Sequence, residues 1–195
     1  STGSKCPCAR MALAQLSLRM RIAVFCGASA GSDPAIIESA RAMAKAIATK
    51  GMGIVYGGGH VGLMGVVADA ALEAGGEVIG VIPGFMIEKE LAHKRLTALI
   101  TVRDMHERKM RMHELSQAVI ALPGGFGTMD ELFELLTWRQ LGIHAKPIGL
   151  LNVNGFYDPL LMQAERMQRD GFLHGPTRIV HASASEDLLR ELLEG

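Results

Sequence analysis

Two glycine-rich segments in this chain have the composition of anion-binding loops. The first contains Gly57, Gly58, Gly59 and Gly62, spaced as G-x-G-x-x-G between an apolar run and a helical pattern. Backbone N–H groups and the positive end of a helix dipole could approach a phosphate there. A dinucleotide site needs an acid at the end of the next strand, which instead ends Val81-Ile82-Pro83. The spacing therefore favours a phosphate, although tight packing of a strand on a helix explains the glycines equally well.

The second segment, residues 123–131, reads Pro-Gly-Gly-Phe-Gly-Thr-Met-Asp-Glu. Its glycines, Gly124, Gly125 and Gly127, expose backbone donors, Thr128 adds a hydroxyl group, and Glu131 adds a carboxylate. Thr-x-x-Glu is also a capping box, with Thr128 as the N-cap. A capping box does not require three glycines, because one suffices for a turn. We therefore expect an anion-binding loop whose carboxylate, in the first turn of a helix, faces the ligand.

A basic pair lies on a third segment, the helix expected over residues 105–116. Met105, Arg108, Met112 and Leu115 fall on one stripe of this helix, so Arg108 interrupts an apolar face. An arginine whose stem covers the core while its head reaches water would explain this. Beside two anion-binding loops, a guanidinium that binds phosphate or carboxylate is the better interpretation. Lys109 is adjacent, but neighbours on a helix point about 100° apart.

Alternating strands and helices must position these residues. Short apolar runs predict strands at residues 21–26, 53–56, 77–82, 97–102, 118–122, 147–151 and 178–182. Helices are expected at 34–50, 62–74, 105–116, 129–141, 158–170 and from 185 onward, with a short helical piece between 83 and 96. This order predicts a single α/β domain over 21–195, Rossmann-like, with a mostly parallel, doubly wound sheet. Loops 27–32 (with Ser29), 57–62 and 123–128 should meet beyond the carboxyl ends of the strands.

Composition narrows the classes of function. Twenty basic residues balance twenty acidic ones among 195, which gives no electrostatic footprint for nucleic acid or an anionic membrane. The odd set of Cys6, Cys8 and Cys26 favours a reducing compartment, and we expect a cytoplasmic protein. The histidines lack metal-ligand spacing, so no metal site is predicted. Residues 1–20 are interpreted as an upstream extension or expression remnant outside the domain.

Taken together, these motifs resemble the LOG ("lonely guy") family of cytokinin riboside 5′-monophosphate phosphoribohydrolases, often mislabelled lysine decarboxylases. The resemblance rests on GGGHVGLMG at 57–65, MHERK at 105–109 and PGGFGTMDE at 123–131, and WRQLGI at 138–143 and LNVNGFY at 151–157 extend it. It implies a Rossmann-like homodimer or larger assembly without a cofactor, in which Arg108 and Glu131 are the catalytic pair. It also implies that Glu90, Lys109 and the loop Gly124, Gly125, Phe126, Gly127, Thr128, Met129 and Asp130 contact substrate. Asp130 departs from the pattern, since many members carry Glu there.

The implied reaction is hydrolysis of the N-glycosidic bond of a nucleoside 5′-monophosphate, either AMP or an N6-substituted AMP. Its transition state should resemble an oxocarbenium ion. The loops with Ser29, Gly57, Gly58, Gly59 and Gly62 and the loop at 124–128 would hold the phosphate. Three other functions remain open. A non-catalytic nucleotide or cofactor carrier would use the same loops, a pyridoxal phosphate decarboxylase would need a Schiff-base lysine, and an interaction module would need neither loop.

Overall fold

The computed structural model describes residues 19–87, 92–174 and 178–194. Within them, seven strands form one sheet in the order β4-β3-β2-β1-β5-β6-β7, and every neighbouring pair is parallel. The strands are β1 (Arg21–Phe25), β2 (Gly53–Tyr56), β3 (Val78–Pro83), β4 (Ala98–Val102), β5 (Ala118–Ala121), β6 (Ile148–Leu151) and β7 (Val180–Ala182). The predicted parallel α/β sheet is therefore confirmed.

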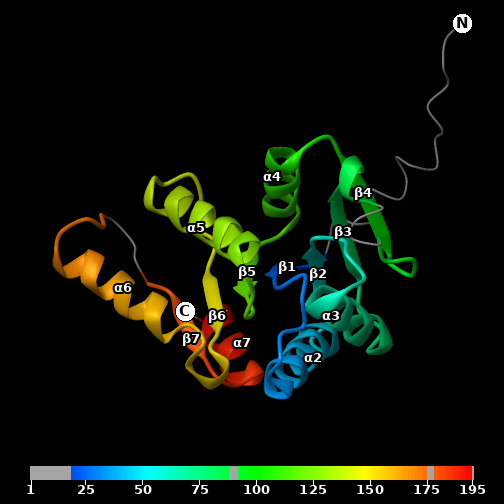
Figure 1. Ribbon diagram of the computed structural model, residues 1–195, viewed down its shortest axis with the longest axis horizontal. Helices are drawn as coiled ribbons and strands as arrows, with labels where there is room; N and C mark the ends of the chain where they lie inside the picture. Colours follow the sequence, from blue (N-terminus) through cyan, green and yellow to red (C-terminus); the bar gives the residue numbers. More distant parts are fainter. Residues whose placement is uncertain (1–18, 88–91, 175–177, 195) are drawn as a thin grey trace, which may run out of the picture.

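Helices cover both faces of the sheet, as Figure 1 shows. On one face lie α2 (Pro34–Thr49), α3 (Gly62–Glu73) and α7 (Ser185–Glu194), and on the other lie α4 (Met105–Leu115), α5 (Phe126–Gln140) and α6 (Asp158–Arg169). Side chains of β1 alternate between the two cores, because Ile22 and Val24 join the first and Ala23 and Phe25 the second. Burial on both faces explains why the strands are continuous apolar runs.

The strand order reverses at β1, which pairs with β2 on one side and β5 on the other. A crevice beyond the carboxyl ends of the strands is expected at such a switch point. The two loops that flank it are joined directly, since the Gly27 N–H donates to the Pro123 carbonyl at 3.2 Å. The topology thus brings the loop after β1 beside the glycine-rich loop after β5.

The start of α5 differs from the sequence prediction. The other predicted bounds lie within one or two residues of the observed ones, but α5 begins at Phe126 with Gly125 as its N-cap, rather than at Met129. Thr128 is therefore the third residue of the helix, and the capping box with Glu131 does not form. The short helical piece expected between residues 83 and 96 is a 3-10 turn at Gly84–Met86.

Two predictions fall on the rest of the chain. Residues 1–18, most of the expected extension, and the candidate substrate contact Glu90 lie outside the described residues. Among the helices that are described, none has both the length and the apolar character that crossing a bilayer requires.

Candidate active site

A cleft of about 460 Å³ opens at the carboxyl ends of β1, β2 and β5. Its lining comes from the end of β1, from the loops that follow the three strands, from the helices they lead into, from α4 and from the turn after β6. The lining residues are Val24, Cys26, Gly27, Ala28, Ser29, Ala30, Gly31, Ile36, Gly57, Leu63, Met64, Arg108, Pro123, Gly124, Gly125, Gly127, Thr128, Glu131 and Phe156. The predicted pair Arg108 and Glu131 thus lines one cleft together with the glycine-rich loop after β5.

Six of the residues that line this cleft are glycines, so main chain is exposed to it. A Cβ on Gly124 would lie 2.1 Å from the Thr128 hydroxyl oxygen and 2.9 Å from the Gly27 nitrogen, so only glycine fits there. A Cβ on Gly125 or Gly127 would meet nothing within 4 Å. The N-cap residue of α5 is Gly125, which has no side chain to accept from the N–H groups of the first turn. The open helix end is suited to an anion.

Arg108 is held by main-chain carbonyls at the edge of the cleft. Its side chain is buried, with Nε donating to the Val81 carbonyl at 3.1 Å and Nη2 to the Gly57 carbonyl at 2.9 Å. A Cβ on Gly57 would lie 2.0 Å from Nη2, so the approach depends on glycine at that position. Arg108 therefore does not extend along the surface to water. Its guanidinium is fixed at the cleft.

Glu131 lies on α5 and is half-buried at the same cleft. Burial raises the pKa of the neighbouring Cys26 thiol far above its ordinary value. The negative charge of Glu131 adds to this increase, while Arg108 opposes it. Both charges thus act at the end of β1, and the thiol stays protonated and is a poor nucleophile. Of Cys26 and Glu131, the carboxylate is therefore the group that can accept a proton.

Several predicted substrate contacts lie elsewhere. The Lys109 ammonium is 3.1 Å from Asp130 Oδ2 and 3.2 Å from Glu134 Oε1, which links α4 to α5. Desolvation opposes the charge of Lys109, but these two carboxylates outweigh it and raise its pKa. Lys109, Phe126, Met129 and Asp130 are absent from the described lining of the cleft, and Phe126 is 95% exposed. Of the predicted loop, Gly124, Gly125, Gly127 and Thr128 are the residues that reach it.

Only part of the first glycine-rich loop reaches the cleft. Gly57 lines the cleft, whereas Gly58 and Gly59 are buried behind it. A Cβ on Gly62 would lie 2.2 Å from the Ala28 carbonyl, and the Leu63 N–H donates to the Gly27 carbonyl at 3.1 Å. The loop therefore packs against residues 27–31 and supports them, so the packing alternative accounts for Gly58, Gly59 and Gly62. Ser29, from the supported loop, does line the cleft.

Sequence reasoning missed the apolar wall formed by Ile36 on α2 and Phe156 after β6. Asn154, in the left-handed region at φ 49°, donates to Asp33 Oδ2 at 2.9 Å. This bond ties the turn after β6 to the N-cap of α2. The available signal was weak, since the segment LNVNGFY follows a strand and so had to lie at the carboxyl edge of the sheet.

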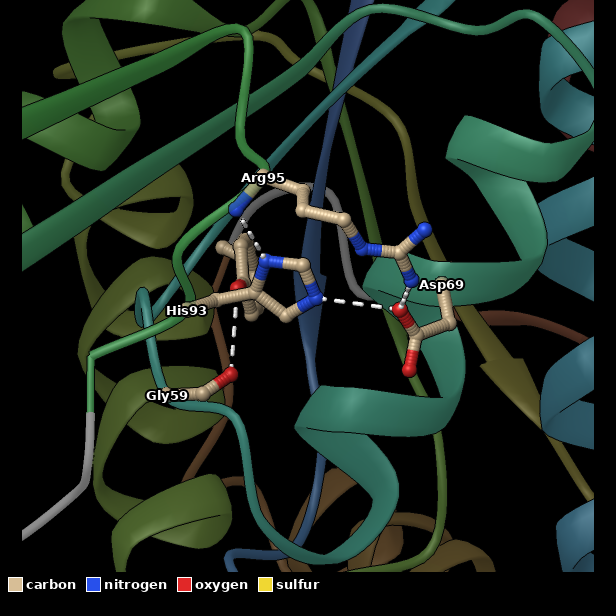
Figure 2. A network of polar contacts seen from close by, with 5 residues as sticks. Gly59, Asp69, His93 and Arg95 are labelled. Atoms are coloured by element: carbon tan, nitrogen blue, oxygen red, sulfur yellow. Dashed lines mark hydrogen bonds and ion pairs between the residues drawn. The ribbon is translucent and has the colours of Figure 1, made fainter.

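One group of side chains within the described residues has the composition of a metal site. The ligand atoms of His60, Asp69 and His93 lie within 4.8 Å of one another. However, the Arg95 N–H donates to Nδ1 of His93, so the neutral ring carries its proton on Nε2, which faces Asp69 (Figure 2). A metal would need that nitrogen unprotonated, and the Asp69 carboxylate is already paired with the Arg95 guanidinium. The geometry fits a hydrogen-bonded network better than a metal centre.

A second groove, of about 570 Å³, lies between α5 and α6. Apolar residues such as Phe133, Leu136 and Leu160 line it together with Arg139, and no glycine-rich loop reaches it. Among the described residues, the buried Nε of Arg139 has no hydrogen-bond partner. This groove is larger than the cleft and has a carboxylate of its own, Glu165, but it has no glycine-rich loop, so the cleft at β1 and β5 is the candidate active site.

Comparison with known proteins identifies the family. The family model described as "Possible lysine decarboxylase" matches residues 64–192. A "probable cytokinin riboside 5′-monophosphate phosphoribohydrolase" of Oryza sativa subsp. japonica is 46% identical over 174 residues, which cover 88% of this chain and 78% of the rice protein. The chain belongs to the LOG family. A cytokinin riboside 5′-monophosphate phosphoribohydrolase of Arabidopsis thaliana is another LOG relative, 44% identical over 174 residues that cover 88% of this chain and 76% of the plant protein.

Solved structures extend the fold of this LOG chain to other proteins. The molybdenum cofactor binding protein of Rippkaea orientalis superposes with a TM-score of 0.68 at 23% identity, covering 91% of this chain and 98% of that one. The Moco carrier protein of Chlamydomonas reinhardtii gives 0.67 at 23% identity, covering 90% and 98%. At this identity the likeness shows the shared fold alone.

Proposed function

We propose that this protein hydrolyses the N-glycosidic bond of a nucleoside 5′-monophosphate, releasing a free base and ribose 5-phosphate. The observation that carries the proposal is the placement of Glu131 and Arg108 on one cleft with the start of α5, whose N-cap residue is a glycine. The LOG relatives in rice and Arabidopsis, named as cytokinin riboside 5′-monophosphate phosphoribohydrolases, support the same chemistry.

The phosphate binds at the start of α5. N–H groups of the segment Gly125–Thr128 donate to it, the helix dipole adds positive potential, and the hydroxyls of Ser29 and Thr128 are nearby donors on the same cleft. Gly125 and Gly127 leave this surface open because no side chain covers it.

Glu131 acts on the ribose. Water attacks C1′, a C–O bond forms there, and the C–N bond to the base breaks as positive charge develops on the sugar. The departing base keeps the electron pair of the C–N bond and takes up a proton, which balances the proton lost by the water. A carboxylate beside C1′ stabilises that charge, and it can accept a proton from the attacking water. A guanidinium is a poor proton donor, so the work of Arg108 is to position the phosphate or Glu131.

The base lies against the apolar wall of Ile36 and Phe156. Phe156 is 41% exposed, and its ring packs edge-on to Tyr157, with centroids 5.0 Å apart. A flat heteroaromatic base gains contact area on such a wall. The base is adenine or an N6-substituted adenine, and the extent of this wall decides between them.

The assembly and location of the protein belong to the same proposal. We propose a homodimer or larger assembly, because the groove between α5 and α6 presents apolar side chains and a buried arginine nitrogen that a second copy could cover. The free thiol of Cys26 accords with the reducing conditions of the cytoplasm. The reaction as written needs neither a cofactor nor a metal.

The test incubates the purified protein separately with AMP and with isopentenyladenosine 5′-monophosphate, and measures free base and ribose 5-phosphate. We expect both products in equal amounts, with different rates for the two substrates. Tight binding of either nucleotide without release of base would overturn the hydrolase and favour a carrier.

A further inference from the structure

A segment distant in sequence packs on the back of the first glycine-rich loop. The His93 N–H donates to the Gly58 carbonyl at 3.1 Å, and Ala92 forms an antiparallel bridge with Gly59. Gly58 has φ +80° and lies behind the residue that accepts from Arg108. This segment is therefore one of the supports of the loop, together with the Tyr56 hydroxyl, which donates to the Gly59 carbonyl at 3.0 Å. The three glycines have no side chains with which to fix the loop themselves.

The His93 side chain fixes that segment in turn. It is buried, accepts from the Arg95 N–H at Nδ1 (3.2 Å), and donates from Nε2 to Asp69 Oδ1 at 3.1 Å (Figure 2). Burial of Asp69 alone would raise the pKa of its carboxyl group, but hydrogen bonds from His93 and Arg95 outweigh this and lower it. The carboxylate is thus a charged acceptor that anchors the imidazole to α3.

A continuous set of contacts leads from this network to the active-site arginine. Asp69 holds His93, His93 holds Gly58, and the adjacent Gly57 carbonyl accepts from Nη2 of Arg108. Arg108 has a second main-chain acceptor, Val81, so its guanidinium lies correctly only when both carbonyls do. A shift of the glycine loop would move one of the two.

We propose that Asp69 and His93 are positioning residues that set the place of the Arg108 guanidinium through the main chain of Gly57 and Gly58. The inference rests on the proposed function in one respect: the rate of nucleotide hydrolysis is the most sensitive measure of a misplaced Arg108. It assigns a role to a buried histidine and a carboxylate that do not line the cleft, and it makes no use of a metal.

The variants must separate hydrogen bonding from bulk. His93→Phe keeps an aromatic ring but removes both hydrogen bonds, whereas His93→Gln keeps one acceptor and one donor. His144 offers a matched control, because it also accepts a backbone N–H at Nδ1, from Lys146 at 3.1 Å, and contacts the Leu135 carbonyl through Nε2 at 3.0 Å. It lies in the connection from α5 to β6, at the opposite edge of the sheet from the cleft.

We expect His93→Phe to lower kcat/KM for AMP by roughly ten- to a hundredfold, the scale of a misplaced active-site group. His93→Gln and His144→Phe should each stay within about threefold of wild type, since each spares the positioning bonds. Thermal melting of all variants identifies losses that come from unfolding. Equal losses in His93→Phe and His144→Phe, or no rescue by glutamine, would overturn the proposal.

A double-mutant cycle tests whether the effect passes through Arg108. His93→Phe should cost much less in the Arg108→Ala background than in the wild type, because the group it positions is already absent. Additive losses would refute the coupling. The same cycle is also measured on the dissociation constant of AMP. If the wild type binds AMP but releases no base, the proposed hydrolase is refuted, and the coupling of His93 to Arg108 is still measured through binding.

Discussion

The guanidinium Nη2 of Arg108 lies 2.9 Å from the carbonyl oxygen of Gly57, and a Cβ on that glycine would come within 2.0 Å of it. The position of the Arg108 guanidinium therefore requires a residue without a side chain at position 57. Gly57→Ala should displace the guanidinium and reduce kcat/KM at least tenfold, since active-site geometry is sensitive to shifts of about 1 Å. Gly84→Ala is the control, because its Cβ would make an ordinary contact of 3.7 Å with Thr101. Wild-type kinetics in Gly57→Ala would show that the position of Arg108 does not matter.

Glu131→Gln should retain the fold and nucleotide binding but lose most turnover. The amide keeps the size of the side chain and removes the negative charge that stabilises the oxocarbenium-like sugar. A loss of roughly a hundredfold or more in kcat is expected for a group with this role. Glu134→Gln is the matched control, because Glu134 is on the same helix but pairs with Lys109 instead. Base release by Glu131→Gln near the wild-type rate would remove Glu131 from the mechanism.

Phe156→Ala should weaken AMP binding roughly three- to tenfold, because contact with one aromatic ring contributes about 0.5–1.5 kcal/mol beyond its buried area. Binding of ribose 5-phosphate, which has no base, should not change. Phe172→Ala removes another exposed ring outside the described lining of the cleft and controls for a general effect. Calorimetric titration of both ligands gives the comparison, and an equal loss for the two would place the base elsewhere.

Stability should fall as the pH decreases from about 6.5 to about 4, in part through His113. Burial, and then the nearby Lys146 and His144, lower the pKa of His113 from 6.5 to about 4. In this range the unfolded chain binds a proton at His113 that the folded chain does not, so acid favours unfolding. His113→Gln should therefore lose less melting temperature than wild type between pH 7 and pH 5, whereas His106→Gln, at an exposed position on α4, should match wild type. Parallel pH dependence in all three proteins would assign the acid sensitivity to other groups.

The fold was predictable because its elements differ sharply in pattern. Apolar runs such as residues 118–121 are too short for helices, and signals such as Asp33-Pro34 mark where helices begin. The start of α5 was wrong because Thr-x-x-Glu fits a capping box and Gly-Phe-Gly does not resemble a helix. In the structure, the residues that look like a loop form the first turn, and Gly125 and Gly127 leave space beside it.

The candidate site was predictable in part. Arg108 stood out as a charge on an apolar stripe, and the structure explains it by two buried carbonyl acceptors. Helix geometry alone sets Lys109 about 100° away from Arg108. The partners of Lys109, which are Asp130 and Glu134, depend on how α4 lies beside α5, and the sequence does not show this. Ile36 and Phe156 were missed because a pocket wall is made by residues that are distant in sequence, with no shared pattern.

Main chain is exposed to the cleft where the loops after β1 and β5 meet at Gly27 and Gly124. A surface without side chains offers little for substitution to modify. Under the proposed function, the means of holding a sugar phosphate should therefore persist while homologous chains diverge. Changes in the preferred base can then accumulate at Ile36 and Phe156 without weakening the anchor. Selectivity for the base and binding of the phosphate are thus carried by different residues. Substitutions on α2 and after β6 can therefore change the preferred base while the phosphate site stays the same.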